Sequence, residues 1–214
     1  MFIRKAVLML SGVLAATGAH ALVTVAGTTY ADAALVNSFI GSSGAFSVSP
    51  TGSAQAQVIT DSNVSTGVIA GSGPYIDLGW TQGLAVNGVG TDIDLYSLTG
   101  GVSLNTPGTF QVTVNGVVQQ YTSAGTGYTT NILGFPFQIN RVSVDLTSFS
   151  VASGAGISSL RVTFFEQNAI YGPSLSLVAA SNFAPLPEPG RFALLAAGLG
   201  VVGLIVRRRS LRKA

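Results

Sequence analysis

The sequence lacks cysteine, and its only histidine, His20, lies close to the N-terminus. Lysine is also absent between Leu22 and Glu188. These absences exclude disulfides, a thiol nucleophile and a thiolate metal site, and they remove the usual general base and the Schiff-base amine from this region. Only carboxylates, hydroxyls and two arginines remain there for chemistry. We therefore expect a non-enzymatic protein without an organic cofactor.

Positive charge is equally scarce in the middle of the chain. Between Leu22 and Glu188 the only cations are Arg141 and Arg161, whereas all eight acidic residues lie in this range, so its net charge is −6. The other eight cations lie near the two ends of the chain and make the full sequence basic. A nucleic-acid surface needs clustered lysine and arginine, so no nucleic-acid partner is expected.

The N-terminus has the three regions of a secretory signal peptide. Two cations precede a short apolar core at Ala6–Ala16, and Ala19-His20-Ala21 forms an A-x-A cleavage site. The apolar core is too short for a permanent membrane span, and a buried N-terminal helix is the alternative. We expect residues 1–21 to be removed after export by the Sec machinery, so that the mature chain begins at Leu22.

The C-terminus combines a proline-rich segment, an apolar run at residues 192–206 and a basic tail at residues 207–213. As a helix the fifteen-residue run spans about 22 Å, which is shorter than the roughly 20 residues of a comfortable span. Arg207, Arg208 and Arg209 follow it directly and favour the cytoplasmic side of a membrane. The pattern predicts a transmembrane helix with a basic stop.

This order of segments resembles the PEP-CTERM sorting signal of Gram-negative bacteria, with Pro187-Glu188-Pro189 at the position of the Pro-Glu-Pro motif. The resemblance implies recognition by an exosortase, a membrane-embedded cysteine transpeptidase-like enzyme that cuts near the motif. It also implies transient anchoring in the inner membrane, then a cell-surface or extracellular location beside exopolysaccharide or in a biofilm. An ordinary C-terminal anchor that stays in the membrane is the alternative.

Between these segments, residues 22–184 have the composition of one β-domain. Gly, Ser, Thr and Val are abundant and helix-forming charged residues are rare. Several stretches alternate apolar and polar residues between turn signals, which predicts an all-β fold, an antiparallel β-sandwich of seven or eight strands. Residues 31–40 come nearest to a helical pattern. Residues 185–214 form the separate sorting segment.

Turn residues predict how two pairs of strands are connected. Gly71-Ser-Gly-Pro74 predicts a hairpin between strands at residues 64–70 and 75–80. Asn115-Gly116 predicts a type I′ hairpin, because both residues tolerate a positive φ. The remaining expected strands lie at residues 92–98, 110–114, 142–146, 160–164 and 175–179.

The segments Tyr75–Trp80, Val86–Tyr96 and Thr109–Gly116 form a pattern similar to that of exported PEP-CTERM proteins and of jelly rolls of the galactose-binding-like class. Residues 142–149 and 157–164 are similar to the closing strands of that class. The resemblance covers residues 64–177 and implies a carbohydrate-binding or adhesive module. Ligand residues vary widely in that class, so it assigns none here.

Asp92 and Asp94 are the candidate metal ligands. At positions i and i+2 of a strand they share one face, where two carboxylates can hold Ca²⁺ together with carbonyls of Gly88 and Gly90. The alternatives are a solvated strand face and an Asp92 that accepts hydrogen bonds from turn amides. A glycosidase also needs two carboxylates, but nothing in the sequence tunes the pKa of either one.

Trp80 is the candidate for stacking on a sugar ring, although a single tryptophan is more often a core residue. The other aromatic candidates are Tyr75, Tyr96, Tyr121 and Tyr128. Arg141 and Arg161 are expected to pair with acids across a strand, such as Asp145 or Glu166. Two functions remain: a structural or adhesive protein of the surface or matrix, and a carbohydrate-binding module with a defined pocket.

Overall fold

The computed structural model describes residues 21–100, 108–165, 173–186 and 198–199. The chain divides into two units, Met1–Ala184 and Pro185–Ala214. The sorting motif, the basic tail and nearly all of the signal peptide lie outside the described residues, so these predictions stay predictions. Of the apolar run only Gly198 and Leu199 are described, both helical. Within the described ranges, no helix has the length and apolarity needed to cross a membrane.

Strands dominate the described residues, and the expected all-β class is confirmed. The first nine strands are β1 (Leu22–Val25), β2 (Thr28–Ala31), β3 (Ser38–Ser43), β4 (Ser47–Ser49), β5 (Gly67–Ile69), β6 (Tyr75–Gly79), β7 (Gly83–Val86), β8 (Ile93–Gly100) and β9 (Thr109–Val114). They are followed by β10 (Val117–Thr122), β11 (Ala124–Ile132), β12 (Phe135–Val144), β13 (Gly156–Ile157), β14 (Ser159–Phe164), β15 (Ser174–Leu175), β16 (Leu177–Ala180) and β17 (Phe183–Pro185). The helical elements are the 3₁₀ helices η1 (Asp32–Ala34) and η2 (Leu146–Phe149) and the short helix α1 (Gln55–Thr60).

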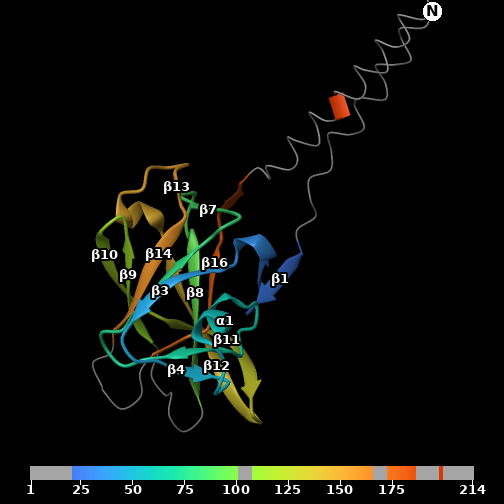
Figure 1. The fold of residues 1–214 in the computed structure, drawn as a ribbon, viewed down its shortest axis with the longest axis vertical. Coiled ribbons are helices and arrows are strands. Elements are labelled where there is room, and N and C mark those ends of the chain that lie inside the picture. The colour runs from blue at the N-terminus through green and yellow to red at the C-terminus, as the bar shows by residue number, and fades with distance from the viewer. Residues whose placement is uncertain (1–20, 101–107, 166–172, 187–197, 200–214) are drawn as a thin grey trace, which may run out of the picture. The chain divides into compact units, whose positions relative to one another are not determined.

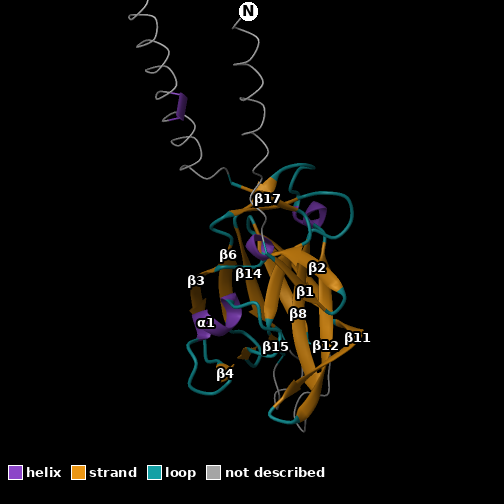
Figure 2. Ribbon diagram, turned by 90° about the vertical axis from the view of Figure 1, so that its right-hand side faces the viewer, coloured by secondary structure: helices purple, strands orange, loops and turns teal. Residues whose placement is uncertain are grey.

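The strands form several antiparallel sheets, of which two are large (Figures 1 and 2). One has five strands in the order β10-β9-β14-β6-β3, and the other has four in the order β11-β12-β8-β16. Two three-stranded sheets, β13-β7-β17 and β15-β5-β4, and the β1-β2 hairpin make up the rest. Sequence-distant strands therefore lie side by side, as β8 does between β12 and β16.

Alternating side chains of the large sheets build one hydrophobic core. On β14 the residues Leu160, Val162 and Phe164 are buried, while the polar residues between them are partly exposed. Val162 lies opposite Val112 of β9, and the Phe164 and Phe110 rings meet edge to face with centroids 5.6 Å apart. The core also includes buried side chains of β8, β12 and β16. The period-two pattern is thus confirmed in β14 and β9, whereas β8 and β16 are buried on both faces.

The two expected hairpins have different outcomes. Asn115 and Gly116 have φ values of 50° and 81° and connect paired strands β9 and β10, as predicted. The prediction of a hairpin across Gly71–Pro74 is wrong, because the flanking strands do not pair with each other. β5 pairs with β4 and β15, whereas β6 pairs with β3 and β14. Instead, the Gly73 amide and the Pro74 carbonyl bond to the Phe164 backbone, so this segment leads the chain from one sheet to another.

Residues 31–40, where a short helix or an irregular lead-in was expected, contain η1 and the start of β3. The helix α1 was not expected. Its Val58 and Ile59 side chains are buried in the core, which stabilises a helix too short to persist alone.

Candidate functional site

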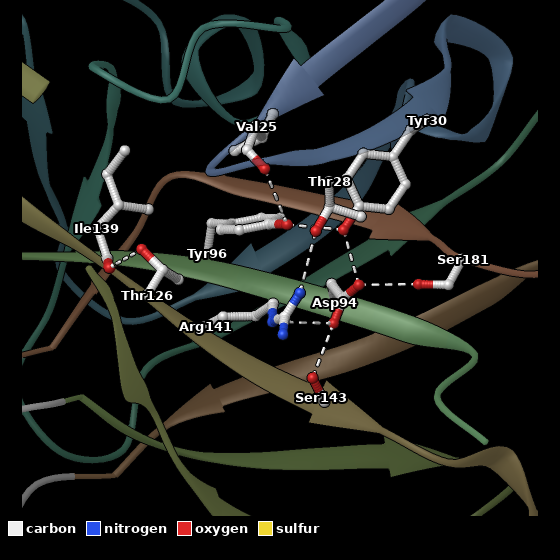
Figure 3. Close-up of polar contacts among 10 residues, drawn as sticks. All are labelled: Val25, Thr28, Tyr30, Asp94, Tyr96, Thr126, Ile139, Arg141, Ser143 and Ser181. Carbon is white, nitrogen blue, oxygen red and sulfur yellow. Dashed lines mark hydrogen bonds and ion pairs between the residues drawn. The ribbon is translucent and has the colours of Figure 1, made fainter. Parts of the chain in front are cut away.

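Asp92 directly precedes β8 and Asp94 is the second residue of that strand, which lies between β12 and β16 in the four-stranded sheet. Both are buried, with exposed fractions of 0% and 2%. Asp94 shares a face of β8 with Tyr96, and Val25 and Tyr30 of the β1-β2 hairpin are buried near that face (Figure 3). The interpretation of these carboxylates as part of a solvated strand face is therefore wrong.

The Asp92 carboxylate joins three separate chain segments. Its Oδ1 accepts hydrogen bonds from the Gly88 amide and the Asn182 side-chain amide, both at 2.8 Å. Its Oδ2 accepts one from the Leu146 amide, also at 2.8 Å. Each donor is a nitrogen whose hydrogen is fixed by a planar amide. Asp92 thus bonds turn amides, one of the alternatives predicted from the sequence, and ties the β7–β8 loop to η2 and to the residues after β16.

The Asp94 carboxylate accepts hydrogen bonds from three hydroxyls. Its Oδ2 accepts from Tyr30 at 2.7 Å and from Ser181 at 2.8 Å, and its Oδ1 accepts from Ser143 at 2.9 Å. The Arg141 Nε lies 3.7 Å from Oδ1 and completes the surroundings with a positive charge. Figure 3 shows these groups converging on Asp94 from β2, β12 and the end of β16. A buried carboxylate needs such partners to remain charged.

Tyr30 connects the N-terminal hairpin to this cluster. Its hydroxyl lies 2.7 Å from that of Tyr96, and the two rings meet edge to face (Figure 3). Burial, together with the hydrogen bonds to Tyr96 and Asp94, raises the pKa of the Tyr30 hydroxyl well above its ordinary value. Tyr30 is therefore a proton donor that stays protonated, and its role is to hold β2 against β8.

Among the described residues neither arginine pairs with Asp145, and a pairing with Glu166 stays a prediction. Arg141, whose side chain is 40% exposed, lies beside Asp94 and donates to Thr28 at 3.1 Å. Arg161 forms a two-pronged contact with Asp77, which lies directly opposite on β6, and its guanidinium sits 3.7 Å from the centre of the Tyr75 ring. The pairing of β12 with β8 and of β14 with β6 therefore determines which acid each arginine contacts. Asp145 instead caps η2, and Glu166 lies outside the described residues.

Asp92, Asp94 and their hydrogen-bond partners form a polar cluster, and this cluster holds strands and loops together. Every carboxylate oxygen of Asp92 and Asp94 accepts at least one hydrogen bond from the protein, and Ca²⁺ would compete with those donors for the same lone pairs. Among the described residues, no group of three or more acidic, histidine or cysteine side chains is placed to hold a metal ion. The calcium site at Asp92 and Asp94 is untested, and the hydrogen bonds that engage all four carboxylate oxygens argue against it.

Trp80 is a core residue rather than a platform for sugar. It is 3% exposed, and its indole N–H donates to the Ala34 carbonyl at 2.8 Å. Of the tyrosines considered with it, Tyr96 is fully buried and Tyr121 stacks on Phe149, whereas Tyr128 is exposed. The aromatic side chain chosen from the sequence therefore lies in the core.

Sequence reasoning missed most partners of the two carboxylates. Tyr30, Ser181 and Asn182 lie more than sixty residues from Asp92 and Asp94, and no local pattern links them. Ser143 and Arg141 carried a partial signal, since they alternate with core residues on a strand. Knowing that β12 pairs with β8 would have placed them opposite Asp94 and Tyr96.

No protein-family model matches this chain, and no curated protein is similar to it. The features that bear on its function are the hydrogen-bonded side chains around Asp92 and Asp94, the surface and the two terminal segments.

Proposed function

We propose that this chain is an exported, non-enzymatic protein of the bacterial cell surface or extracellular matrix, associated with exopolysaccharide. The observation that carries this proposal is that the two carboxylates best suited to catalysis have a structural role instead. Asp92 and Asp94, the best candidates for chemistry, are buried and occupied in holding strands together. Carboxylates that are buried and hydrogen-bonded stabilise the domain and are not available for catalysis, as expected of a structural protein.

The finer architecture belongs to the same proposal. The five-stranded and four-stranded sheets contribute to one core, and all strand pairings within these two sheets are antiparallel. This supports a β-sandwich of the jelly-roll, galactose-binding-like kind. The carbohydrate-binding alternative would now depend on Tyr128, because the Trp80 ring is enclosed by the core.

Hydroxyl and amide side chains support contact with polysaccharide. The edge strand β10 presents Gln120 and Thr122 to solvent, and the edge strand β11 presents Thr129 and Asn131. Such neutral donors and acceptors match the hydroxyls of a glycan without needing a closed pocket. The net charge of −6 between Leu22 and Glu188 also keeps the processed form soluble.

Export and sorting complete the proposal. The apolar run 192–206 would halt in the inner membrane, because each charge of the basic tail costs ~2.5–3.5 kcal/mol at a membrane centre. Pro187-Glu188-Pro189 would then lie at the outer surface of that membrane. The prolines disfavour helix and keep this segment extended for an exosortase.

Intact-mass measurement of the protein from a Gram-negative host with an exosortase tests this proposal. We expect a surface or secreted form that begins near Leu22 and ends near the motif. Replacing residues 187–189 by alanine should leave an uncut form in the inner-membrane fraction, whereas Pro185→Ala, just outside the motif, should be processed normally. A surface form that still carries residues 207–214 would contradict the sorting proposal.

A polysaccharide assay addresses the function itself. The processed protein should cosediment with exopolysaccharide of its host, and the extent should be insensitive to Trp80→Phe. Saturable binding of one short oligosaccharide, abolished by Tyr128→Ala, would instead establish the defined sugar pocket.

A further inference from the structure

The β11-β12 hairpin ends in an exposed apolar turn, here called the apolar tip and defined as Leu133–Pro136. All four residues are exposed, Leu133 at 91% and Phe135 at 62%. Single exposed apolar residues are normal on soluble proteins. Consecutive ones at a turn are unfavourable unless they have a function.

The geometry of this turn favours a different residue. Leu133 and Gly134 have φ values of 52° and 86°, and they close a two-residue loop between the paired residues Ile132 and Phe135. Positive φ at both positions favours Asn-Gly. The β9-β10 hairpin has that pair, Asn115-Gly116, at nearly the same angles. Leu133 therefore combines an unfavourable backbone conformation with an exposed side chain, and neither folding nor solubility accounts for it.

The base of the hairpin is fixed, so the tip is presented in a defined place. Ile132 and Phe137 pack against the hydrophobic core just behind the tip. The Thr130 hydroxyl lies 2.6 Å from that of Ser65, which joins the hairpin to another part of the domain. Figure 1 shows the hairpin in yellow, and Figure 2 shows β11 and β12 running together to its end.

The stretch of chain on either side of the tip carries no charge. No Asp, Glu, Lys, Arg or His occurs between Asp94 and Arg141, a segment that contains most of β8, the first part of β12 and the whole of β9, β10 and β11. The first polar residues on either side of the tip are neutral, Asn131 before it and Gln138 after it. A hairpin also pairs its own backbone groups. Entry into a lipid layer requires both properties, since unpaired backbone groups and charges are costly there.

We propose that the apolar tip inserts into the surface of an uncharged lipid bilayer and holds the domain against it. The tip is convex and contributes two large side chains, far less than the roughly 1,600 Å² of a standard protein interface. A fluid lipid layer needs no shaped pocket to accept it. The net charge of −6 of residues 22–188 opposes anionic lipid, so the partner is a zwitterionic surface.

This inference does not depend on sorting or on polysaccharide binding. Two side chains provide weak and reversible attachment by themselves, as a single lipid chain does. Such attachment would orient a domain that is already near a membrane rather than recruit it from solution.

Fluorescence of a tryptophan at the tip tests the inference on the full chain. Trp80, the only natural tryptophan, is buried and supplies a constant background. Phe135→Trp should show a blue-shifted emission in phosphatidylcholine vesicles, and lipids brominated on their acyl chains should quench it. Val118→Trp is the matched control, because Val118 is also an exposed apolar residue but lies on the β9-β10 hairpin. It should show neither effect.

Adding Leu133→Asn to Phe135→Trp should shift the equilibrium between inserted and free tip about tenfold toward the free form, because it removes one large apolar side chain. It should not lower the melting temperature, since Asn suits the turn. Equal quenching at positions 118 and 135, quenching unchanged by Leu133→Asn, or a blue shift only in anionic vesicles would overturn the inference. A blue shift without vesicles, together with a larger species in solution, would assign the tip to self-association instead.

Discussion

Replacing Asp92 by asparagine tests the interpretation of the polar cluster most directly. The substitution keeps the shape of the side chain but exchanges one carboxylate oxygen for an NH₂ group. In the best orientation the remaining oxygen still faces the Gly88 and Asn182 donors, and the NH₂ group then faces the Leu146 amide. Two donors would point at each other in a site with no exposed surface.

The cost follows from the hydrogen bonds involved. A buried donor without a partner costs about 1–3 kcal/mol, and each of the other two bonds loses about 1 kcal/mol when its acceptor becomes neutral. Relief from burying a charge offsets part of this sum. We expect the free energy of unfolding to fall by about 3 kcal/mol, which in a chain of this size lowers the melting temperature by roughly 6–12 °C.

Thermal unfolding of Asp92→Asn beside Asp145→Asn provides the measurement and its control. Asp145 lies next to Leu146 and accepts a hydrogen bond from the Thr147 amide at the start of η2. An asparagine oxygen caps a helix about as well as a carboxylate, so Asp145→Asn should leave the melting temperature nearly unchanged. Equal stability of the two variants would refute the assignment of Asp92 as a fastener of three segments.

The effect of Ca²⁺ on stability distinguishes a purely structural role of Asp92 and Asp94 from a role as metal ligands. With the Asp92 and Asp94 oxygens engaged by protein donors, we expect the same melting temperature in millimolar Ca²⁺ and in a chelator. A site that binds only the folded state would add about 2.7 kcal/mol at a hundredfold excess of ligand over Kd. A rise in the melting temperature that Asp92→Asn abolishes would therefore support the calcium site.

Two further outcomes are expected. Because burial raises the pKa of Tyr30, the unfolded chain loses this proton first, and the stability that Tyr30 contributes is present below about pH 10 and is lost as the pH rises further. Melting temperatures measured from pH 8 to about pH 11 should fall less steeply for Tyr30→Phe, and identical profiles would contradict this role. Gly67→Ala should lower the melting temperature by destabilising the fold about 1–3 kcal/mol, because its Cβ would lie 2.6 Å from the Leu175 carbonyl oxygen. Gly41→Ala should leave the melting temperature unchanged, because its Cβ would meet no atom within 4 Å. Similar decreases in melting temperature in both variants would contradict the steric explanation.

The local parts of the fold were predictable because short-range chemistry encodes them. Alternation in Leu160, Val162 and Phe164 identifies a strand with one buried face, and Asn115-Gly116 identifies a two-residue turn. The Gly71–Pro74 cluster also identified a turn, but not the strands it connects. A turn signal states that the chain bends, whereas the hydrogen-bond partners of the flanking strands depend on residues elsewhere.

The candidate site was predictable only in its central residues. Asp92 and Asp94 stood out because charges are rare in this chain, and their spacing on a strand was correct. Their burial was not predictable, since alternation normally indicates a strand with one face toward solvent. The β1-β2 hairpin covers part of that second face, and Tyr30 reaches Asp94 across more than sixty residues of sequence.

By itself, the sequence determined the all-β class, the acidic middle of the chain and the absence of cysteine, histidine and lysine from that middle. These properties depend on composition and on patterns a few residues long. Tertiary structure alone decided which strands share a sheet, that Trp80 lies in the core, and that the two carboxylates fasten strands together. The physical reason is that burial and hydrogen-bond partners arise from contacts between distant segments, and a single strand has no means of specifying what will cover its second face.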